Sequence, residues 1–147
     1  MNVPDVVPSV VLVDSEIVGS IDHGMLLLIG FSSNDTKESI LPTLEKIVKL
    51  RIFSDQEGKM NKSVLDVEGS MLLISQFTLY ADTKKGNRPS FIEAARPEQA
   101  IPLYEFFIAE MKKRISKVET GIFGADMKVE LVNDGPVTII IDSKNKS

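Results

Sequence analysis

The segment that most constrains the fold is an apolar run near the middle of the chain that passes directly into polar residues. Met71-Leu72-Leu73-Ile74 is followed at once by Ser75-Gln76-Phe77-Thr78-Leu79-Tyr80. A short, continuous apolar run of this kind is typical of a strand covered on both faces. Because a sheet holds the groups at a strand end in place, such an end is a rigid platform. We therefore expect a sheet with this strand inside it and candidate functional groups where the strand ends.

The rest of the chain predicts further strands. Pro4 and Pro8 each remove a backbone donor, so the first strand, which ends near Val13, should be short, irregular or at an edge. Two more strands should follow it as a β-meander, and the second of these, at residues 25–31, should be buried on both faces. The strands predicted after the first are Glu16–Ile21 and residues 25–31, 51–53, 117–119, 127–132 and 137–142.

Two main helices are predicted between these strands. Asp35 and Glu38, three residues apart, resemble a capping box at the start of the first helix. Pro42 lies inside its apolar pattern, where an interior proline costs about 3 kcal/mol, so we expect a kink or a restarted helix there. Pro97 can begin the second helix, which should extend to about Lys113.

Residue types that are absent or rare exclude several classes of protein. The 147 residues include no cysteine, which excludes disulfides, thiolate nucleophiles and zinc sites built on cysteine. The longest apolar run is too short to span a bilayer and the N-terminus lacks the features of a secretory signal, so we expect a cytoplasmic protein without a membrane partner. A net charge of −4 disfavours broad contact with nucleic-acid phosphates but permits contact at one end. No repeat or linker divides the chain, so residues 1–147 should form one domain, with a frayed tail at 143–147.

The single histidine also excludes most hydrolase designs. His23 lies in a predicted hairpin turn, where it should be exposed, whereas a serine–histidine–acid triad needs a histidine beside the nucleophile. No histidine or carboxylate cluster has the spacing of metal ligands, so no metal is expected. The remaining candidates are Ser75, Gln76, Thr78 and the backbone amides around Phe77, which could hold an oxyanion but include no evident base. An ordinary strand end is the simpler interpretation of the same residues.

A second candidate is the turn-rich stretch from Asn133 to Thr138. Its Asn-Asp-Gly-Pro core combines side chains that hydrogen-bond their own backbone, a glycine that accepts positive φ and a proline that fixes φ. Such a stretch can simply join two strands as a hairpin. Alternatively, Gly135 and Pro136 can bring bare backbone against a ligand, where any Cβ would collide.

Four stretches, taken in order, resemble the D-aminoacyl-tRNA deacylases. They are Ser75-Gln76-Phe77-Thr78-Leu79, residues 82–91, residues 121–127 and Asn133-Asp134-Gly135-Pro136-Val137-Thr138. The resemblance extends from about Glu16 to Asp142 and implies an α/β (α+β) fold with an antiparallel, barrel-like β-sheet and two main helices. It also implies a homodimeric hydrolase, for which we expect no cofactor. The implied reaction cleaves the ester between a D-amino acid, or glycine mischarged on tRNA(Ala), and the 3′-terminal adenosine of tRNA.

The resemblance assigns roles to particular residues. Gly135-Pro136 of one subunit would enter the other subunit's site with a cis peptide bond and reject L side chains by steric exclusion, which glycine escapes. In that site Ser75 would contact substrate. The catalytic candidates are Gln76, Phe77 and Thr78, with Thr78 as a candidate nucleophile and the ribose 2′-hydroxyl of the substrate as the alternative. Phe123 and Met127 would either wall the adenine or only pack in the core.

Several alternatives stay open on the sequence alone. The family carries Gln-Arg-Val where this chain has Pro4-Asp5-Val6, so activity or stereochemical filtering could be altered. A non-catalytic dimeric module that binds an aminoacylated RNA 3′ end is therefore the second hypothesis. Lys84, Lys85 and Arg88 form either a solvated loop or a contact with the acceptor end.

Overall fold

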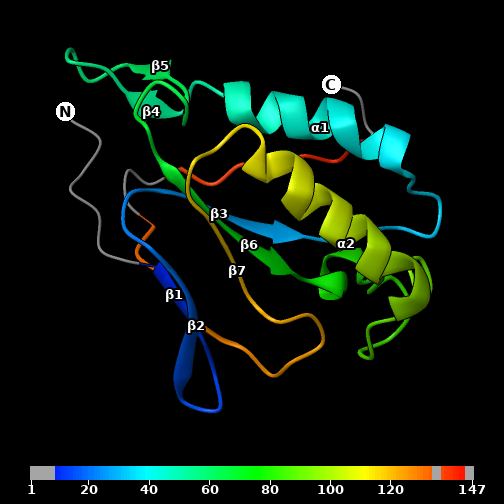
Figure 1. Cartoon of the computed structure of the whole chain (residues 1–147). Helices are drawn as coiled ribbons and strands as arrows, with labels where there is room; N and C mark the ends of the chain where they lie inside the picture. The colour runs from blue at the N-terminus through cyan, green and yellow to red at the C-terminus, as the bar shows by residue number, and fades with distance from the viewer. Residues whose placement is uncertain (1–8, 134–136, 145–147) are drawn as a thin grey trace.

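The computed structural model describes residues 9–133 and 137–144. Two long helices and eight strands are spread along this part of the chain (Figure 1). In order, the elements are β1 (Ser9–Val13), β2 (Glu16–Ile21), β3 (Gly24–Ile29), α1 (Lys37–Lys49), β4 (Phe53–Ser54), β5 (Met60–Lys62), β6 (Ser70–Ser75), the 3₁₀ helix η1 (Phe77–Tyr80), α2 (Pro97–Lys112), β7 (Val118–Thr120) and β8 (Lys128–Glu130).

The strands form three small sheets. One is parallel, with the order β3-β6-β7, a second is antiparallel, with the order β2-β1-β8, and β4 pairs with β5. The expected antiparallel arrangement is therefore wrong for the sheet that contains β6, and the described strands close no barrel. The cause is the position of the helices: α1 connects β3 to β4–β6 and α2 connects β6 to β7, and a crossover through a helix brings the next strand back in parallel.

Strand β6 lies at the centre of three layers. Met71 and Leu73 belong to the cluster formed with α1 and α2, whereas Leu72 and Ile74 belong to the cluster formed with β1 and β2. All four side chains are 0% exposed, because alternation along a strand directs successive side chains to opposite faces and both faces are covered. In Figure 1 the two helices lie on one side of β3 and β6, and β1 and β2 lie on the other. The predicted strand buried on both faces is confirmed.

Strand β3 differs from expectation in where it lies, whereas β1 agrees with its expectation. β3 is an edge strand of the parallel sheet, and its Leu28 is 47% exposed, so the prediction that both of its faces are buried is wrong. β1 is short and has an irregularity between Val11 and Leu12, as expected, but it lies in the middle of its sheet. The three-stranded meander is limited to the β1–β2 hairpin, since β3 pairs with β6 instead.

Both predicted helices are present, with a different cap at the start of α1. Thr36 is the N-cap and forms a capping box with Ser39, in which each side chain accepts a hydrogen bond from the other's backbone N–H at 3.0–3.2 Å. The Asp35 carboxylate instead accepts from the Ser39 hydroxyl at 3.0 Å, so the expected pairing of Asp35 with Glu38 is wrong. α1 continues through Pro42 without ending there, and α2 begins at the predicted proline.

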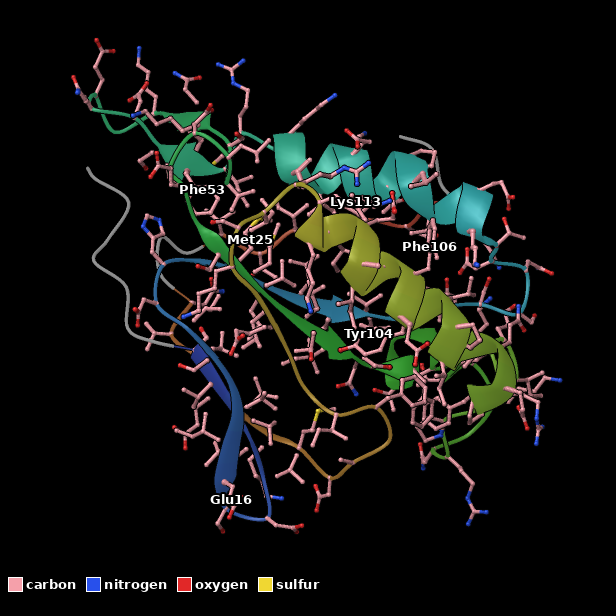
Figure 2. All side chains as sticks on the ribbon, in the orientation of Figure 1. Glu16, Met25, Phe53, Tyr104, Phe106 and Lys113 are labelled. Atoms are coloured by element: carbon pink, nitrogen blue, oxygen red, sulfur yellow. The ribbon has the colours of Figure 1, made fainter. Side chains whose placement is uncertain are left out.

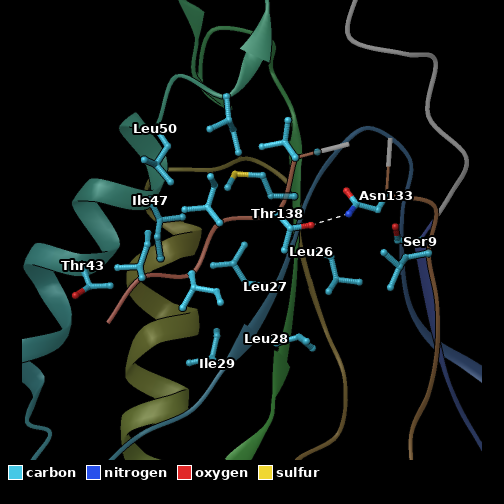
Figure 3. A pocket seen from close by; sticks show the side chains of 18 of the residues that line it. Ser9, Leu26, Leu27, Leu28, Ile29, Thr43, Ile47, Leu50, Asn133 and Thr138 are labelled. Atoms are coloured by element: carbon cyan, nitrogen blue, oxygen red, sulfur yellow. Dashed lines mark hydrogen bonds between the residues drawn. The ribbon is translucent and has the colours of Figure 1, made fainter. Parts of the chain in front are cut away.

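The C-terminal segment departs most from the prediction. Residues 137–142 form no strand, although their sequence is rich in β-branched residues. The segment passes between β3 and α1, where it lines a cavity together with both (Figure 3). It makes no ladder of backbone hydrogen bonds with the free edge of β3, which is what a strand requires. At its end, Lys144 Nζ lies 5.9 Å from the centre of the Tyr80 ring, and residues 145–147 of the expected frayed tail lie outside the described residues.

Candidate active site

The polar stretch predicted from the sequence begins where the parallel sheet ends. Ser75 is the last residue of β6 and pairs with Ile29, the last residue of β3. The Gln76 N–H donates to the Ile29 carbonyl at 2.7 Å, which fixes the chain as it leaves the sheet. In open α/β sheets, ligands bind beyond the carboxyl ends of parallel strands. The fold therefore places Ser75–Thr78 at the edge where a ligand site is expected.

Gln76 and Thr78 are joined by their side chains. The Gln76 amide nitrogen donates a hydrogen bond to the Thr78 hydroxyl oxygen, and both residues are partly exposed. A nucleophilic threonine needs a base that removes its proton, and a carboxamide is not basic through either its oxygen or its nitrogen. The geometry thus orients the Thr78 hydroxyl without activating it.

His23 lies at the wrong end of the sheet to act as that base. It directly precedes Gly24, which pairs with Ser70, whereas Ser75 lies five residues further along the same pairing. At about 3.3 Å per residue, the two ends are about 17 Å apart. His23 is also partly buried, with its ring centroid 5.6 Å from that of Phe53, so the expectation of an exposed turn histidine is wrong.

Two backbone donors lie beside the Thr78 hydroxyl. In the part of the chain that the structure describes, the N–H groups of Phe77 and Thr78 have no acceptor, and the first internal bond of this turn is that from Leu79 N to Gln76 O at 3.2 Å. Phe77 is 54% exposed, and its ring meets the Phe91 ring edge-on, with centroids 5.2 Å apart. This arrangement provides two unpaired N–H donors and a hydroxyl on neighbouring residues at an accessible surface, and such groups can stabilise an oxyanion.

A buried tyrosine supports the platform from beneath. Tyr104 of α2 extends to β6 and donates a hydrogen bond from its hydroxyl to the Leu73 carbonyl at 2.8 Å (Figure 2). Burial raises the pKa of the Tyr104 hydroxyl to about 12, so the group stays protonated as a donor. This contact was not predicted from the sequence. The only sequence feature that pointed to it was the position of Tyr104 on the apolar face of the second predicted helix.

Phe123 and Met127 are both partly buried, but they pack against different clusters. The Phe123 ring lies 6.0 Å from the Tyr104 ring and packs against the cluster below the helices. Met127 packs against the cluster formed with β1 and β2, close to Gly121. These contacts are those of core residues, and a role for the two side chains as walls for an adenine stays a prediction.

Gly135 and Pro136 lie outside the described residues, but the residues on either side of them are in contact. The Asn133 side-chain amide donates a hydrogen bond to the Thr138 hydroxyl at 2.6 Å, drawn as a dashed line in Figure 3. This bond ties together the two ends of the segment that carries the Gly-Pro pair. The expected hairpin is not formed, because β8 ends at Glu130 and residues 137–142 form no strand.

An apolar cavity lies elsewhere in the fold. It has a volume of about 890 Å³ and is lined by β3, α1 and residues 137–143, whereas Ser75–Thr78 do not contribute to it. Its wall of leucine and isoleucine side chains from β3 is apolar, as the labelled residues in Figure 3 show. Asn133 and Thr138 lie at its rim, so the cavity reaches the segment that bears the Gly-Pro pair.

Residues 9–133 and 137–144 contain neither a metal-binding cluster nor a membrane-spanning helix. No three histidine or carboxylate groups are placed so that they could hold a metal ion. No helix in those ranges has the length and hydropathy needed to cross a membrane.

Comparison with known proteins agrees with the fold. The sequence profile of the D-Tyr-tRNA(Tyr) deacylase family matches residues 3–142. The D-aminoacyl-tRNA deacylase of Geobacillus sp. (strain WCH70) is 55% identical over 137 residues, which cover 93% of this chain and 90% of the relative. The D-aminoacyl-tRNA deacylase of Cytophaga hutchinsonii is 59% identical over 139 residues, which cover 94% of this chain and 92% of the relative.

Two solved structures are also similar. The structure titled c-Myc DNA Unwinding Element Binding Protein superposes with a TM-score of 0.85 at 40% identity and covers 92% of each chain. A probable eukaryotic D-amino acid tRNA deacylase superposes with a TM-score of 0.76 at 18% identity, covering 90% of this chain and 92% of its own, which shows a shared fold. Fold and sequence together define an α/β enzyme of the hydrolase class. The chain belongs to the D-Tyr-tRNA(Tyr) deacylase family.

Proposed function

We propose that this protein hydrolyses the ester bond of D-aminoacyl-tRNA, releasing the D-amino acid and tRNA, and that it spares L-aminoacyl-tRNA. The observation that carries the proposal is the pair of free N–H groups at Phe77 and Thr78 beside the end of β6, in a chain whose relatives are named D-aminoacyl-tRNA deacylases. These two donors hold the ester carbonyl oxygen and stabilise the negative charge that develops on it. The reaction takes place in the cytoplasm.

The proton transfers of this reaction come from the substrate. Among the described residues no base is hydrogen-bonded to the Thr78 hydroxyl, whose oxygen accepts a hydrogen bond from the Gln76 amide. The 2′-hydroxyl of the terminal ribose lies next to the scissile ester in any aminoacylated 3′ end. Holding that hydroxyl and a water in line with the carbonyl supplies catalysis through orientation. Ser75, partly exposed at the end of β6, contacts the bound aminoacyl group.

The chirality filter is the Gly135-Pro136 pair of a second subunit, entering the site with a cis peptide bond. Backbone that approaches the α-carbon closely leaves room for a hydrogen but not for an L side chain. D-amino acids and glycine pass this filter, so glycyl-tRNA(Ala) is also a substrate. Phe123 and Met127 flank the adenine. In the homodimer each of two equivalent sites combines one subunit's Ser75–Thr78 with the other's Gly-Pro pair, and the strands of the dimer complete the barrel-like sheet.

The first test compares three substrates. Purified protein should release D-tyrosine from D-tyrosyl-tRNA and glycine from glycyl-tRNA(Ala), and should leave L-tyrosyl-tRNA largely intact. Equal release from the D and L esters would contradict the proposed chirality filter. Release from neither ester would contradict the proposed deacylase activity.

A mixing experiment tests the composite site. Phe77→Pro lacks one N–H donor, and Gly135→Ala adds a methyl group at the Gly-Pro pair, so each homodimer should be inactive. When the two variants are unfolded together and refolded, each heterodimer regains one intact site, and about a quarter of all sites should be active. Mixtures that stay inactive although heterodimers are detected by native mass spectrometry would contradict a site shared between subunits.

A non-catalytic binding module is the second candidate. One observation favours it: a 40% identical structure is titled as a protein that binds a DNA unwinding element. A module of this kind would bind a non-hydrolysable D-aminoacyl-adenosine analogue and release no amino acid from any of the three substrates.

A further inference from the structure

The loop that follows η1 carries an unneutralised group of positive charges. Lys84, Lys85 and Arg88 are all exposed, and within residues 9–133 and 137–144 none of them forms an ion pair. Asp82 is the one acid in residues 82–90, so the loop carries three positive charges against one negative charge. The whole chain, by contrast, carries a net charge of −4.

The cations at the end of α2 are placed differently. Lys113 pairs with Glu110 at 2.5 Å, and Arg114 pairs with Glu45 of α1 at 2.5 Å. The Arg114 guanidinium holds the pKa of the Glu45 carboxyl below its ordinary value through this hydrogen bond. Arg114 therefore connects the two helices and Lys113 is neutralised at the end of α2, whereas the loop cations form no ion pair with an acid of the described chain.

The loop is fixed at its base and open at its tip. Asp82 and Ser90 exchange two backbone hydrogen bonds, of 2.7 and 2.9 Å, and the Asp82 carboxylate accepts from the Lys84 N–H at 2.9 Å. At the tip, Gly86 has φ +69°, and no atom lies within 4 Å of where its Cβ would be. The cations therefore project from a defined base into open space.

The base of the loop touches the candidate active site. Phe91 follows Ser90 directly, and its ring packs edge-on against that of Phe77 with centroids 5.2 Å apart. Arg88 is three residues from Phe91, so their Cα atoms are at most about 11 Å apart. The charges consequently lie at the rim of the surface that presents the Phe77 and Thr78 N–H groups.

We propose that Lys84, Lys85 and Arg88 bind the backbone phosphates of the RNA acceptor end while the terminal ester occupies the Phe77–Thr78 surface. The proposal rests on the proposed function, because it concerns the substrate of the same site. A chain with net charge −4 needs a locally positive surface to receive a polyanion, and this loop supplies one where the ester must enter. Exposed lysine and arginine contact phosphates without regard to base sequence, which suits an enzyme that acts on many tRNAs.

The experiment compares two variants with equal loss of charge. The loop variant is Lys84→Gln, Lys85→Gln and Arg88→Gln. The control variant removes three exposed lysines that have no ion pair among the described residues, near the far ends of α1 and α2: Lys46→Gln, Lys112→Gln and Lys117→Gln. KM and kcat for D-tyrosyl-tRNA are measured over a range of salt concentrations, with the D-tyrosyl ester of adenosine, which has no phosphate, as a second substrate.

The loop variant should raise KM for D-tyrosyl-tRNA about tenfold at low salt, with kcat unchanged. The slope of log KM against log salt should fall by about 2, since each phosphate contact on a single strand contributes about 0.7. The control variant should match the parent, and all three proteins should cleave the adenosine ester with the same KM. A loop variant with the KM and salt slope of the control would overturn the proposal while leaving the deacylase activity in place.

If the parent fails to cleave D-tyrosyl-tRNA, it is the proposed function that fails. The loop is then tested by fluorescence anisotropy with a labelled RNA hairpin that ends in the tRNA acceptor sequence. Weaker binding of the hairpin by the loop variant than by the control supports the phosphate site, and equal binding contradicts it.

Discussion

The side-chain amide of Gln76 donates a hydrogen bond to the hydroxyl of Thr78. The hydrogen-bond partner of this hydroxyl is therefore a donor and not a base. A threonine in this setting is poorly suited to attack an ester. It is well suited to hold a polar substrate group in a fixed position.

Thr78→Ala should therefore reduce the activity only modestly. We expect kcat for D-tyrosyl-tRNA to fall by no more than about tenfold, the effect of losing one neutral hydrogen bond. The measurement is single-turnover kinetics, combined with acid quenching to detect an acyl-enzyme. A loss of several orders of magnitude, or a trapped D-tyrosyl-threonine ester in the parent, would establish Thr78 as the nucleophile instead.

The backbone N–H of Phe77 should matter more than the Thr78 hydroxyl. Phe77→Pro removes this donor, and Gln76, which precedes it, has φ −143° and ψ 82°, outside the helical region that a following proline disfavours. We expect kcat to fall by about 10²–10³, as for the loss of one oxyanion donor.

Phe77→Ala is the matched control for this change, because it removes the same ring and keeps the N–H. The control should retain far more activity than the proline variant, with both folded by circular dichroism. Equal activities in the two variants would show that the ring is used and the amide is not.

The bond between Asn133 and Thr138 should position the Gly135-Pro136 pair. Asn133→Ala and Thr138→Val each remove this exposed bond. We expect each to reduce discrimination between D-tyrosyl-tRNA and L-tyrosyl-tRNA, with little change in melting temperature, because exposed hydrogen bonds add little to stability. The double variant should be no worse than either single one, since both changes break the same bond. Additive losses would mean that the two residues act separately.

Tyr104→Phe should destabilise the fold by about 1 kcal/mol at neutral pH. The substitution removes the hydroxyl that donates to the Leu73 carbonyl. That carbonyl keeps a second donor, the Gly121 N–H at 3.2 Å, so the loss of stability is small. Urea unfolding at pH 7 measures the difference. A change of 3 kcal/mol or more would indicate that the hydroxyl supports the platform through further contacts.

The same variant tests how the free energy of unfolding depends on pH. The pKa of Tyr104 rises from 10.0 in the unfolded chain to about 12 in the folded protein because of burial. Above pH 10 the unfolded state loses this proton first, so the parent loses stability with a slope of up to about 1.4 kcal/mol per pH unit until pH 12. Tyr104→Phe has no such proton, so its disadvantage should shrink above pH 10. A constant difference between the two proteins from pH 9 to pH 11 would contradict the raised pKa.

The sequence predicted the elements better than their partners. Local signals were sufficient for the start of α2 at Pro97 and for the buried strand at Met71–Ile74, because proline geometry and an uninterrupted apolar run act over a few residues. They were insufficient for β3, whose apolar run looks the same as that of β6. Which of the two lies inside the sheet depends on where helices α1 and α2 direct the chain, and no short stretch encodes that.

The candidate site was predictable to a similar degree. The polar end of β6 was visible because Ser75–Thr78 directly follow the apolar run. The supporting contacts were not, since Phe91 and Tyr104 reach the site from segments 14 and 26 residues beyond Phe77 and Thr78. Residues 137–142 show the opposite failure: their side chains favour a strand, but a strand forms only where a neighbouring backbone completes the hydrogen bonds.

The parallel pairing of β3, β6 and β7 also determines when each strand can find its partner during translation. Gly24 must wait for Ser70, 46 positions later, and Met71 must wait for Val118, 47 positions later. At about 5–20 residues per second, each wait lasts about 2–9 s on the ribosome. During the first interval β3 has no partner in its own sheet, and during the second the Ser75–Thr78 turn is supported on one side only. The parallel sheet that carries the Ser75–Thr78 turn is therefore complete only after about four-fifths of the chain has been translated.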